Sequence, residues 1–251
     1  MELAIHHITT DKRWADIVLD PATRRQIDEI RDFLKAQVNT GMKAGKSTGS
    51  KSVLFYGPGG TGKSLAAALL GKEAGKRVYR IDLSTVISKY IGETEKNLDA
   101  IFENAEKAGD ILFFDEADAL FGKRSEVKDA HDRYANIEIS YLLQKIEAYP
   151  GLVILATNMK SNIDKAFLRR FNTVVNFPIP AVPDRKKIWE LGLAGTALER
   201  ESPELLSLAE RYELSPGAII KLIERVQVQR NAEPLTYALL KKRIEEDAAE
   251  K

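Results

Sequence analysis

The sequence predicts an α/β fold, with a five-stranded parallel sheet covered by helices on both faces and a small all-helical domain after it. Two observations predict this fold. Five short apolar segments alternate with segments whose apolar residues recur at helical spacing. After Pro178, Pro180 and Pro183 only helical signals remain. The predicted domains are therefore residues 1–183 and 184–251.

The five predicted strands are short runs of apolar, β-branched and aromatic residues. They occupy residues 52–56, 77–82, 110–114, 152–156 and 173–177. Strands that alternate with helices indicate a mostly parallel sheet with both faces covered. Residues 1–18 carry little pattern, and His6 and His7 are interpreted as solvated surface residues.

The predicted helices each place apolar residues on one face. Asp20 and Pro21 have the residue types of an N-cap and a first helical position, and Asp184, Ser202 and Ser215 are further candidate caps. The apolar stripes are Ile27, Ile30, Leu34 and Val38; Leu98, Ile101, Phe102 and Ala105; Ile139, Leu142, Leu143 and Ile146; and Ile219, Leu222, Ile223 and Val226. A final helix is expected to begin near Thr236.

Composition excludes several classes of protein. The 251 residues include 44% hydrophobic and 30% charged residues, which is ordinary for a globular protein. A net charge of +1 gives no general nucleic-acid-binding footprint. The absence of cysteine excludes disulfides, a thiolate catalyst and a cysteine-based zinc site. No apolar run approaches 18 residues and no signal peptide is evident, so a cytoplasmic location without membrane contact is expected.

Residues 57–64, Gly-Pro-Gly-Gly-Thr-Gly-Lys-Ser, match the phosphate-binding pattern G-x-x-x-x-G-K-[ST] between a predicted strand and a predicted helix. Gly59, Gly60 and Gly62 have no Cβ, so the loop can turn its N–H groups toward a polyphosphate. We expect Lys63 to reach the β- and γ-phosphates and Ser64 to bind Mg²⁺. The pattern predicts a P-loop NTPase fold that binds a nucleoside triphosphate.

Two acidic residues, Asp115 and Glu116, follow the third predicted strand. Ligands of open parallel sheets gather at the carboxyl ends of the strands. One carboxylate there can hold Mg²⁺, and the second can polarise an attacking water. The alternative is a pair of surface acids that begin a loop, but this pair follows a phosphate-loop strand.

Two weaker signals lie further along the chain. Asn158 ends the fourth strand, where its amide could touch the γ-phosphate or the water, although asparagine also simply ends strands. Arg169 and Arg170 follow an apolar helical turn. They are either solvated surface residues or guanidinium donors to a developing phosphate charge.

Taken together and in order, these motifs resemble the AAA ATPases of the AAA+ superfamily. The resemblance runs from about Trp14 to the last helix. It includes the phosphate loop, Lys-Tyr-Ile-Gly-Glu-Thr at 89–94, Phe-Asp-Glu-Ala at 114–117, Ala-Thr-Asn at 156–158 and Leu-Arg-Arg-Phe at 168–171. Residues 120–124 and 132–136 are most similar to small bacterial or phage-related members, some of which accompany contractile injection systems.

The resemblance implies ATP or ADP and Mg²⁺ as ligands and assigns a role to each matching residue. Ser64 and Asp115 become the metal-side residues, Glu116 the water-activating base, Asn158 the γ-phosphate sensor, and Arg169 and Arg170 the arginine fingers that act on a neighbouring subunit's nucleotide. The implied nucleotide-binding residues are Asp16, Ile17, Gly59, Gly60, Thr61, Gly62, Lys63, Ser64, Leu65, Ile188, Gly217 and Ala218. Asp16, Ile17 and Ile188 match adenine-holding positions, and Gly217 and Ala218 match the second sensor of the lid.

Tyr90 matches the first pore loop, an aromatic residue that grips a polypeptide at the centre of a hexameric ring. An aromatic residue beside glycine can instead be a packing residue. The resemblance thus implies an Mg²⁺-dependent ATPase whose ring remodels a protein partner. The alternatives are a nucleic-acid-directed loader and a nucleotide-dependent assembly switch. The near-neutral charge and Tyr90 argue against the loader, while Glu116 and the arginine pair argue against the switch.

The sequence departs from the family pattern in two ways. Gly59 and Ser64 stand where proline and threonine are commoner, and both changes keep the chemistry. Little sequence precedes the ATPase module, whereas family members usually choose substrates with an N-terminal domain. The chain is therefore expected to be a minimal member, a fragment, or dependent on an adaptor.

Overall fold

A computed structural model describes residues 5–39, 50–83, 93–117, 130–158, 168–196, 198, 202–229 and 235–249. The chain divides into two compact units. The sheet unit comprises Met1–Lys12, Ala22–Gly57 and Lys63–Asn176, and the helical unit comprises Arg13–Pro21, Pro58–Gly62 and Phe177–Lys251. The predicted division at residue 183 stays a prediction.

Six strands of the described residues form one sheet with the order β1-β3-β4-β5-β2-β6. The five predicted strands are all present and pair in parallel: β2 (Lys51–Tyr56), β3 (Val78–Asp82), β4 (Ile111–Asp115), β5 (Leu152–Thr157) and β6 (Thr173–Asn176). Their parallel pairing brings the carboxyl ends of β2, β4 and β5 to one edge of the sheet. The predicted parallel α/β fold is thus confirmed, with one strand added.

The added strand is β1 (Ile5–Ile8), which pairs antiparallel with β3 at the edge of the sheet. Its four residues place two histidines between two isoleucines, and both histidines are exposed as expected. The His7 ring lies 5.9 Å from the ring of Tyr79 on β3. Four residues are too few to show an alternating hydrophobic pattern. The segment is extended because it pairs with a distant strand.

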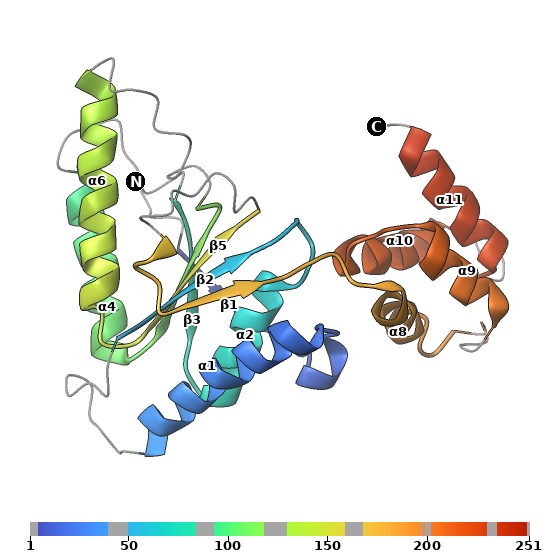
Figure 1. Cartoon of the computed structure of the whole chain (residues 1–251), viewed down its shortest axis with the longest axis horizontal. Coiled ribbons are helices and arrows are strands. Elements are labelled where there is room, and N and C mark those ends of the chain that lie inside the picture. Colours follow the sequence, from blue (N-terminus) through green and yellow to red (C-terminus); the bar gives the residue numbers. More distant parts are fainter. Residues whose placement is uncertain are drawn as a thin grey trace. The chain divides into compact units, whose positions relative to one another are not determined.

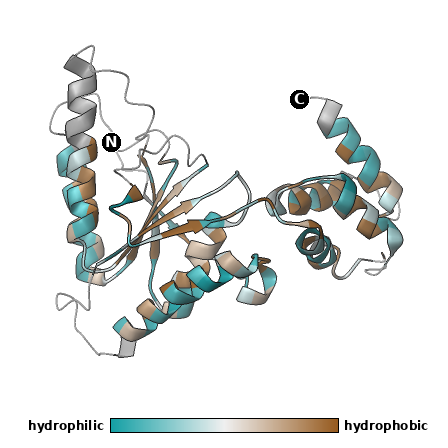
Figure 2. Cartoon of the chain, viewed as in Figure 1, coloured by the Kyte–Doolittle hydropathy of each residue, from teal (hydrophilic) through white to brown (hydrophobic). Residues whose placement is uncertain are grey.

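Helices cover both faces of the sheet (Figure 1). One face carries α4 (Glu93–Ala108) and α6 (Ala130–Ala148), and the other carries α1 (Pro21–Asn39) and α2 (Lys63–Ala74). Figure 2 shows that the strands are the most consistently apolar elements of the sheet unit, while its helices mix apolar and polar residues. This pattern fits strands buried on both faces and helices buried on one.

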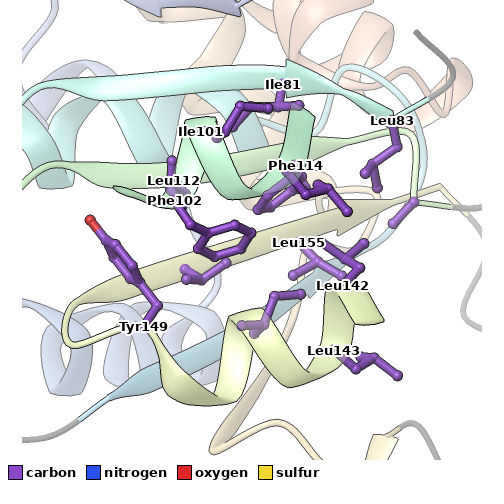
Figure 3. Close-up of a cluster of buried hydrophobic side chains, with 14 of the residues drawn as sticks. Ile81, Leu83, Ile101, Phe102, Leu112, Phe114, Leu142, Leu143, Tyr149 and Leu155 are labelled. Carbon is purple, nitrogen blue, oxygen red and sulfur yellow. The ribbon is translucent and has the colours of Figure 1, made fainter. Parts of the chain in front are cut away.

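The core between the sheet and the helices α4 and α6 contains the residues of the predicted stripes (Figure 3). Phe102 of α4 stacks on Phe114 of β4 at 5.8 Å and meets the edge of Tyr149 at 5.8 Å. The Tyr149 hydroxyl donates to the carbonyl of Asp110 at 2.6 Å. This packing fixes the strand that ends at Asp115.

The helical unit contains α8 (Val182–Gly192), α9 (Pro203–Arg211), α10 (Pro216–Gln229) and α11 (Tyr237–Ala249) around a core of its own. Ser202 is a cap as predicted, since its side chain accepts the N–H of Leu205. Ser215 likewise accepts the N–H of Ala218 at 3.3 Å. The cap predicted at Asp184 is wrong, because α8 begins at Val182 and Asp184 lies within its first turn, where a carboxylate also suits the helix dipole.

No helix in the described part of the chain is both long enough and apolar enough to cross a membrane.

Candidate functional site

The phosphate loop, residues 57–64, joins the end of β2 to the start of α2. The Gly57 N–H donates to the carbonyl of Thr157 on the neighbouring strand β5 at 3.2 Å. Thr61 is buried, and its hydroxyl donates to the carbonyl of Pro58 at 2.8 Å. These contacts shape the loop.

Three glycines of the loop, Gly57, Gly60 and Gly62, have a positive φ. Gly60 has a φ of 75°, and a Cβ there would lie 2.8 Å from the Ser215 hydroxyl. Gly62 has a φ of 104°, and a Cβ there would lie 3.3 Å from the Ile17 side chain. Gly59 differs from these: its φ is not positive and a Cβ would meet nothing within 4 Å. A larger residue at position 59 would therefore fit.

Lys63 is buried, with 7% of its surface exposed, although it is charged. Its ammonium group donates to the carbonyl of Gly57 and to the side-chain oxygen of Asn158 at 3.0 Å. Burial of a charge is costly unless it is paired or hydrogen-bonded. These two neutral acceptors satisfy donors of the ammonium, and an anionic phosphate would be a stronger partner for it. The contact joins two predicted site residues that are 95 positions apart.

Asp115 is the last residue of β4, at the same edge of the sheet as Asn158 after β5. Each of its oxygens has a polar partner. Oδ1 accepts the N–H of Glu116 at 3.0 Å, and Oδ2 lies 2.8 Å from Nη2 of Arg80 on β3. The Asp115 side chain is 17% exposed, so it is accessible from this edge.

Glu116 has a φ of 55°, the one positive value at a non-glycine residue among those the structure describes. The next residue, Ala117, is fully buried, and its N–H donates to the carbonyl of Ala156 at 2.9 Å. The chain therefore turns sharply at Glu116 and leaves this residue exposed. A left-handed conformation costs a residue with a Cβ about 1–2 kcal/mol. Such strain gathers at functional sites.

The residues predicted to hold Mg²⁺ fit a metal that arrives with the nucleotide. Among the described residues, no three His, Cys, Asp or Glu side chains could hold a metal by themselves. Ser64 lies in the first turn of α2, next to Leu65, and both are half-buried. The Ser64 hydroxyl and the Asp115 carboxylate are hard oxygen donors, which suit Mg²⁺ when phosphates complete its ligands.

The residues predicted to hold adenine lie in the helical unit. Ile17 follows a short 3-10 helix, Trp14–Asp16, and its side chain is the neighbour of Gly62 described above. Ile188 is buried in the core of the unit. The Asp16 carboxylate accepts the Arg13 N–H at 2.7 Å, which gives this side chain a structural task.

The predicted second sensor contacts the phosphate loop directly within the helical unit. The N–H of Gly217 donates to the carbonyl of Gly60 at 2.8 Å. A Cβ on Gly217 would lie 3.1 Å from the Gly60 Cα and 3.2 Å from its carbonyl oxygen. Ala218 is exposed and bonds to Ser215 instead. Two glycines thus permit a backbone contact that side chains would prevent.

Arg169 and Arg170 do not join this cluster. Both are exposed, and Arg170 forms an ion pair with Glu147 at 3.2 Å. The Arg170 carbonyl accepts from the hydroxyl of Ser52, near the start of β2, whereas the phosphate loop follows the end of β2. Four residue steps of strand separate Ser52 from Tyr56, or about 13 Å. The arginine pair therefore lies at the opposite edge of the sheet from Lys63.

Two predictions fall on other parts of the chain. Tyr90 lies outside the described residues, and so does the beginning of the stretch similar to bacterial and phage-related members, so both stay predictions. Sequence reasoning missed Arg80 and Ser215 as neighbours of the site. In the sequence Arg80 is one polar residue of an alternating strand, which indicates only a solvent-facing position. Ser215 has the residue type of a helix cap, which indicates no contact with the phosphate loop.

Comparisons with known proteins show which family the sequence matches. The sequence model of the family described as "ATPase family associated with various cellular activities (AAA)" matches residues 53–179, just over half of the chain. The ATPase family gene 2 protein of Schizosaccharomyces pombe is 35% identical over 206 residues, covering 80% of this chain and 26% of that protein. The proteasome-activating nucleotidase of Methanothermobacter thermautotrophicus is 33% identical over 180 residues, covering 69% and 44%. The chain therefore spans less than half the length of these two relatives.

Solved structures show the same fold. The AAA domain of FIGL-1 in complex with ADP has a TM-score of 0.70 over 96% of this chain and 85% of that chain, at 23% identity. The same domain in another crystal structure has a TM-score of 0.71. With the matching family model and the assembled phosphate loop, these findings place the chain in the AAA family of ATPases.

Proposed function

We propose that this chain hydrolyses ATP, with the polyphosphate held by the phosphate loop. The observation that carries the proposal is the contact of Lys63 with Asn158, which joins the phosphate loop to the end of β5. Asp115 and Glu116 lie at the same edge of the sheet, after β4. A buried cation, a polar amide and two carboxylates converge there, as phosphoryl transfer to water requires.

Each residue has a distinct task in this reaction. Lys63 exchanges its neutral acceptors for phosphate oxygens, and the Asn158 amide can then bond to the γ-phosphate or to the attacking water. Glu116, exposed at the turn, accepts the proton of that water. Ser64 and Asp115 would hold Mg²⁺, which when bound neutralises phosphate charge.

Hydrolysis at subunit interfaces is supported by the place of Arg169 and Arg170. A guanidinium at the opposite edge of the sheet is too far from its own chain's phosphate loop to stabilise charge there. A second copy whose phosphate loop faces this edge would bring the two together. Repetition of that head-to-tail contact closes into a ring. We therefore assign the arginine pair to the nucleotide of a neighbouring copy in a hexamer.

Remodelling of a protein partner is the use of ATP that the relatives support best. One of them is named for activating a proteasome, a protein assembly. A partner would be gripped through Tyr90. Nothing in the described residues favours the nucleic-acid loader or the assembly switch, and a cytoplasmic location stays a prediction.

Replacement of Glu116 tests the reaction. Glu116→Gln should bind ATP with parental affinity but lose about 10²- to 10⁴-fold in turnover, the usual worth of a general base. Lys63→Ala should weaken binding itself. Glu103→Gln is a matched control, because it makes the same change at an exposed acid of α4 that pairs only weakly with Lys107 at 4.0 Å.

Binding is measured by calorimetry and turnover by phosphate release. Glu116→Gln that turns over ATP at the rate of Glu103→Gln would exclude the proposed base. ATP binding that survives Lys63→Ala unchanged would exclude the phosphate loop as the site.

A further inference from the structure

Arg80 of β3 is a cation in direct contact with the carboxylate assigned to the metal side. Its Nη2 lies 2.8 Å from Oδ2 of Asp115, and its side chain is 44% exposed. We propose that Arg80 is a positioning residue that orients the Asp115 carboxylate and competes with the metal for it. This inference rests on the proposed function, since it concerns the same site.

The register of the two strands explains why a cation is needed there. Arg80 is opposite Phe113, and Asp82 is directly opposite Asp115. Because side chains alternate between the faces of a strand, Arg80, Asp82 and Asp115 lie on one face. Like charges directly opposite each other destabilise a sheet. Arg80 places a permanent positive charge beside this pair of carboxylates.

The contacts of Asp115 also fix the orientation of its carboxylate. Oδ1 accepts the Glu116 N–H and Oδ2 forms an ion pair with Arg80, so both oxygens have a partner. A divalent cation near Asp115 must share or displace one of them. The Glu116 N–H is part of the backbone turn and stays in place, whereas Arg80 is a long, partly exposed side chain. Arg80 is therefore the group that yields.

The ion pair between Arg80 and Asp115 is weak enough for a metal to displace Arg80. Ion pairs at comparable exposure change an equilibrium by about 1.5- to 5-fold. A contact of that strength orients Asp115 and still gives way to a metal bound with a nucleotide. Removing Arg80 should then strengthen metal binding by about the same factor.

The experiment measures how much a metal strengthens ADP binding, using the whole chain and no turnover. The coupling factor is the ratio of the ADP dissociation constant in EDTA to that in saturating Mn²⁺, both from calorimetry. Arg80→Gln should raise the coupling factor about 1.5- to 5-fold relative to the parent and leave the affinity for metal-free ADP unchanged. Arg80→Lys keeps the charge and should give a coupling factor close to the parental one.

Arg77→Gln is the matched control. Arg77 directly precedes β3 and forms an ion pair at 2.9 Å with Asp110, which directly precedes β4. This pair therefore lies at the amino ends of the two strands that carry Arg80 and Asp115. Its loss removes a comparable exposed guanidinium far from Asp115, so the coupling factor should stay parental. Melting curves without nucleotide report the structural cost of both variants.

Three outcomes separate the possibilities. A coupling factor in Arg80→Gln equal to that of Arg77→Gln would overturn the inference while the proposed function stands. Weaker binding of metal-free ADP in Arg80→Gln would also overturn it, since Arg80 would then contact phosphate. A parent that binds no ADP with or without Mn²⁺ would overturn the proposed function and this inference with it.

Discussion

Replacing Gly217 with alanine should weaken the binding of nucleotides that carry a β-phosphate. The Gly217 N–H donates to the Gly60 carbonyl at 2.8 Å. In a trans peptide the carbonyl and the following N–H point in opposite directions. The bond that holds the Gly60 carbonyl therefore turns the Thr61 N–H away from α10. We expect this N–H to be one of those that face the phosphates.

The magnitude follows from the space at Gly217. The alanine Cβ would lie 3.1 Å and 3.2 Å from the Gly60 Cα and oxygen, both backbone atoms, so the two segments must move apart by a few tenths of an ångström. Loss of the hydrogen bond would cost about 0.5–1.5 kcal/mol. That corresponds to an increase of about two- to twelve-fold in the ADP dissociation constant, with ATP affected similarly.

Calorimetry with ADP and AMP on three proteins checks this reasoning. AMP lacks the β-phosphate and should bind Gly217→Ala as it binds the parent. Ala218→Gly is the control: it weakens α10 by about 1 kcal/mol of helix propensity but touches neither Gly60 nor the loop. Gly217→Ala has the opposite effect on propensity, so loss of helix stability cannot explain a weaker ADP affinity. Equal losses for AMP and ADP, or none for either, would refute the argument.

Two further predictions concern stability. Glu116→Gly should keep the parental free energy of unfolding, because relief of about 1–2 kcal/mol of left-handed strain offsets the larger chain entropy of glycine. Glu103→Gly in α4 has no such strain to relieve and should lose about 1 kcal/mol. Chemical denaturation measures both. A loss at Glu116 as large as at Glu103 would contradict the strain. Tyr149→Phe should lose about 1–3 kcal/mol because the Asp110 carbonyl loses its buried donor. Burial raises the pKa of Tyr149 above its unfolded value of about 10, so the parent should lose stability as pH rises past 10. Chemical denaturation at pH 8 and at pH 11 measures this loss. If the free energy of unfolding falls as much between the two pH values in Tyr149→Phe as in the parent, Tyr149 is not the group responsible.

The parts of the fold that sequence predicted are those with a local cause. The five parallel strands are apolar runs, and the phosphate loop is a spaced set of residue types, so each is visible in one short window. β1 is not, because Ile5–Ile8 becomes a strand only through pairing with β3. The cap at Asp184 was predicted wrongly for a related reason: three prolines within six residues, at 178, 180 and 183, allow more than one helix start.

The candidate site divides in the same way. Lys63, Asp115 and Asn158 were predicted to gather at one edge of the sheet, and the structure brings them there. The contact of Arg80 with Asp115 depends on the register of β3 against β4, which no single segment encodes. The approach of Gly217 to Gly60 likewise depends on how the helical unit folds around the loop. Roles that follow from such contacts are invisible until the chain is folded.

The measurement that tests the central claim most directly is complementation between two inactive variants. Lys63→Ala should lack a working phosphate loop, and the double variant Arg169→Ala/Arg170→Ala should lack the group supplied to a neighbour. If the active site is shared between copies, a mixture contains some interfaces that pair an intact loop with intact arginines. Phosphate release by the mixture should then clearly exceed the sum of the two separate preparations. Light scattering of chains that carry tags of different size shows whether mixed oligomers form. If they form and the activity only equals that sum, hydrolysis at shared interfaces is contradicted.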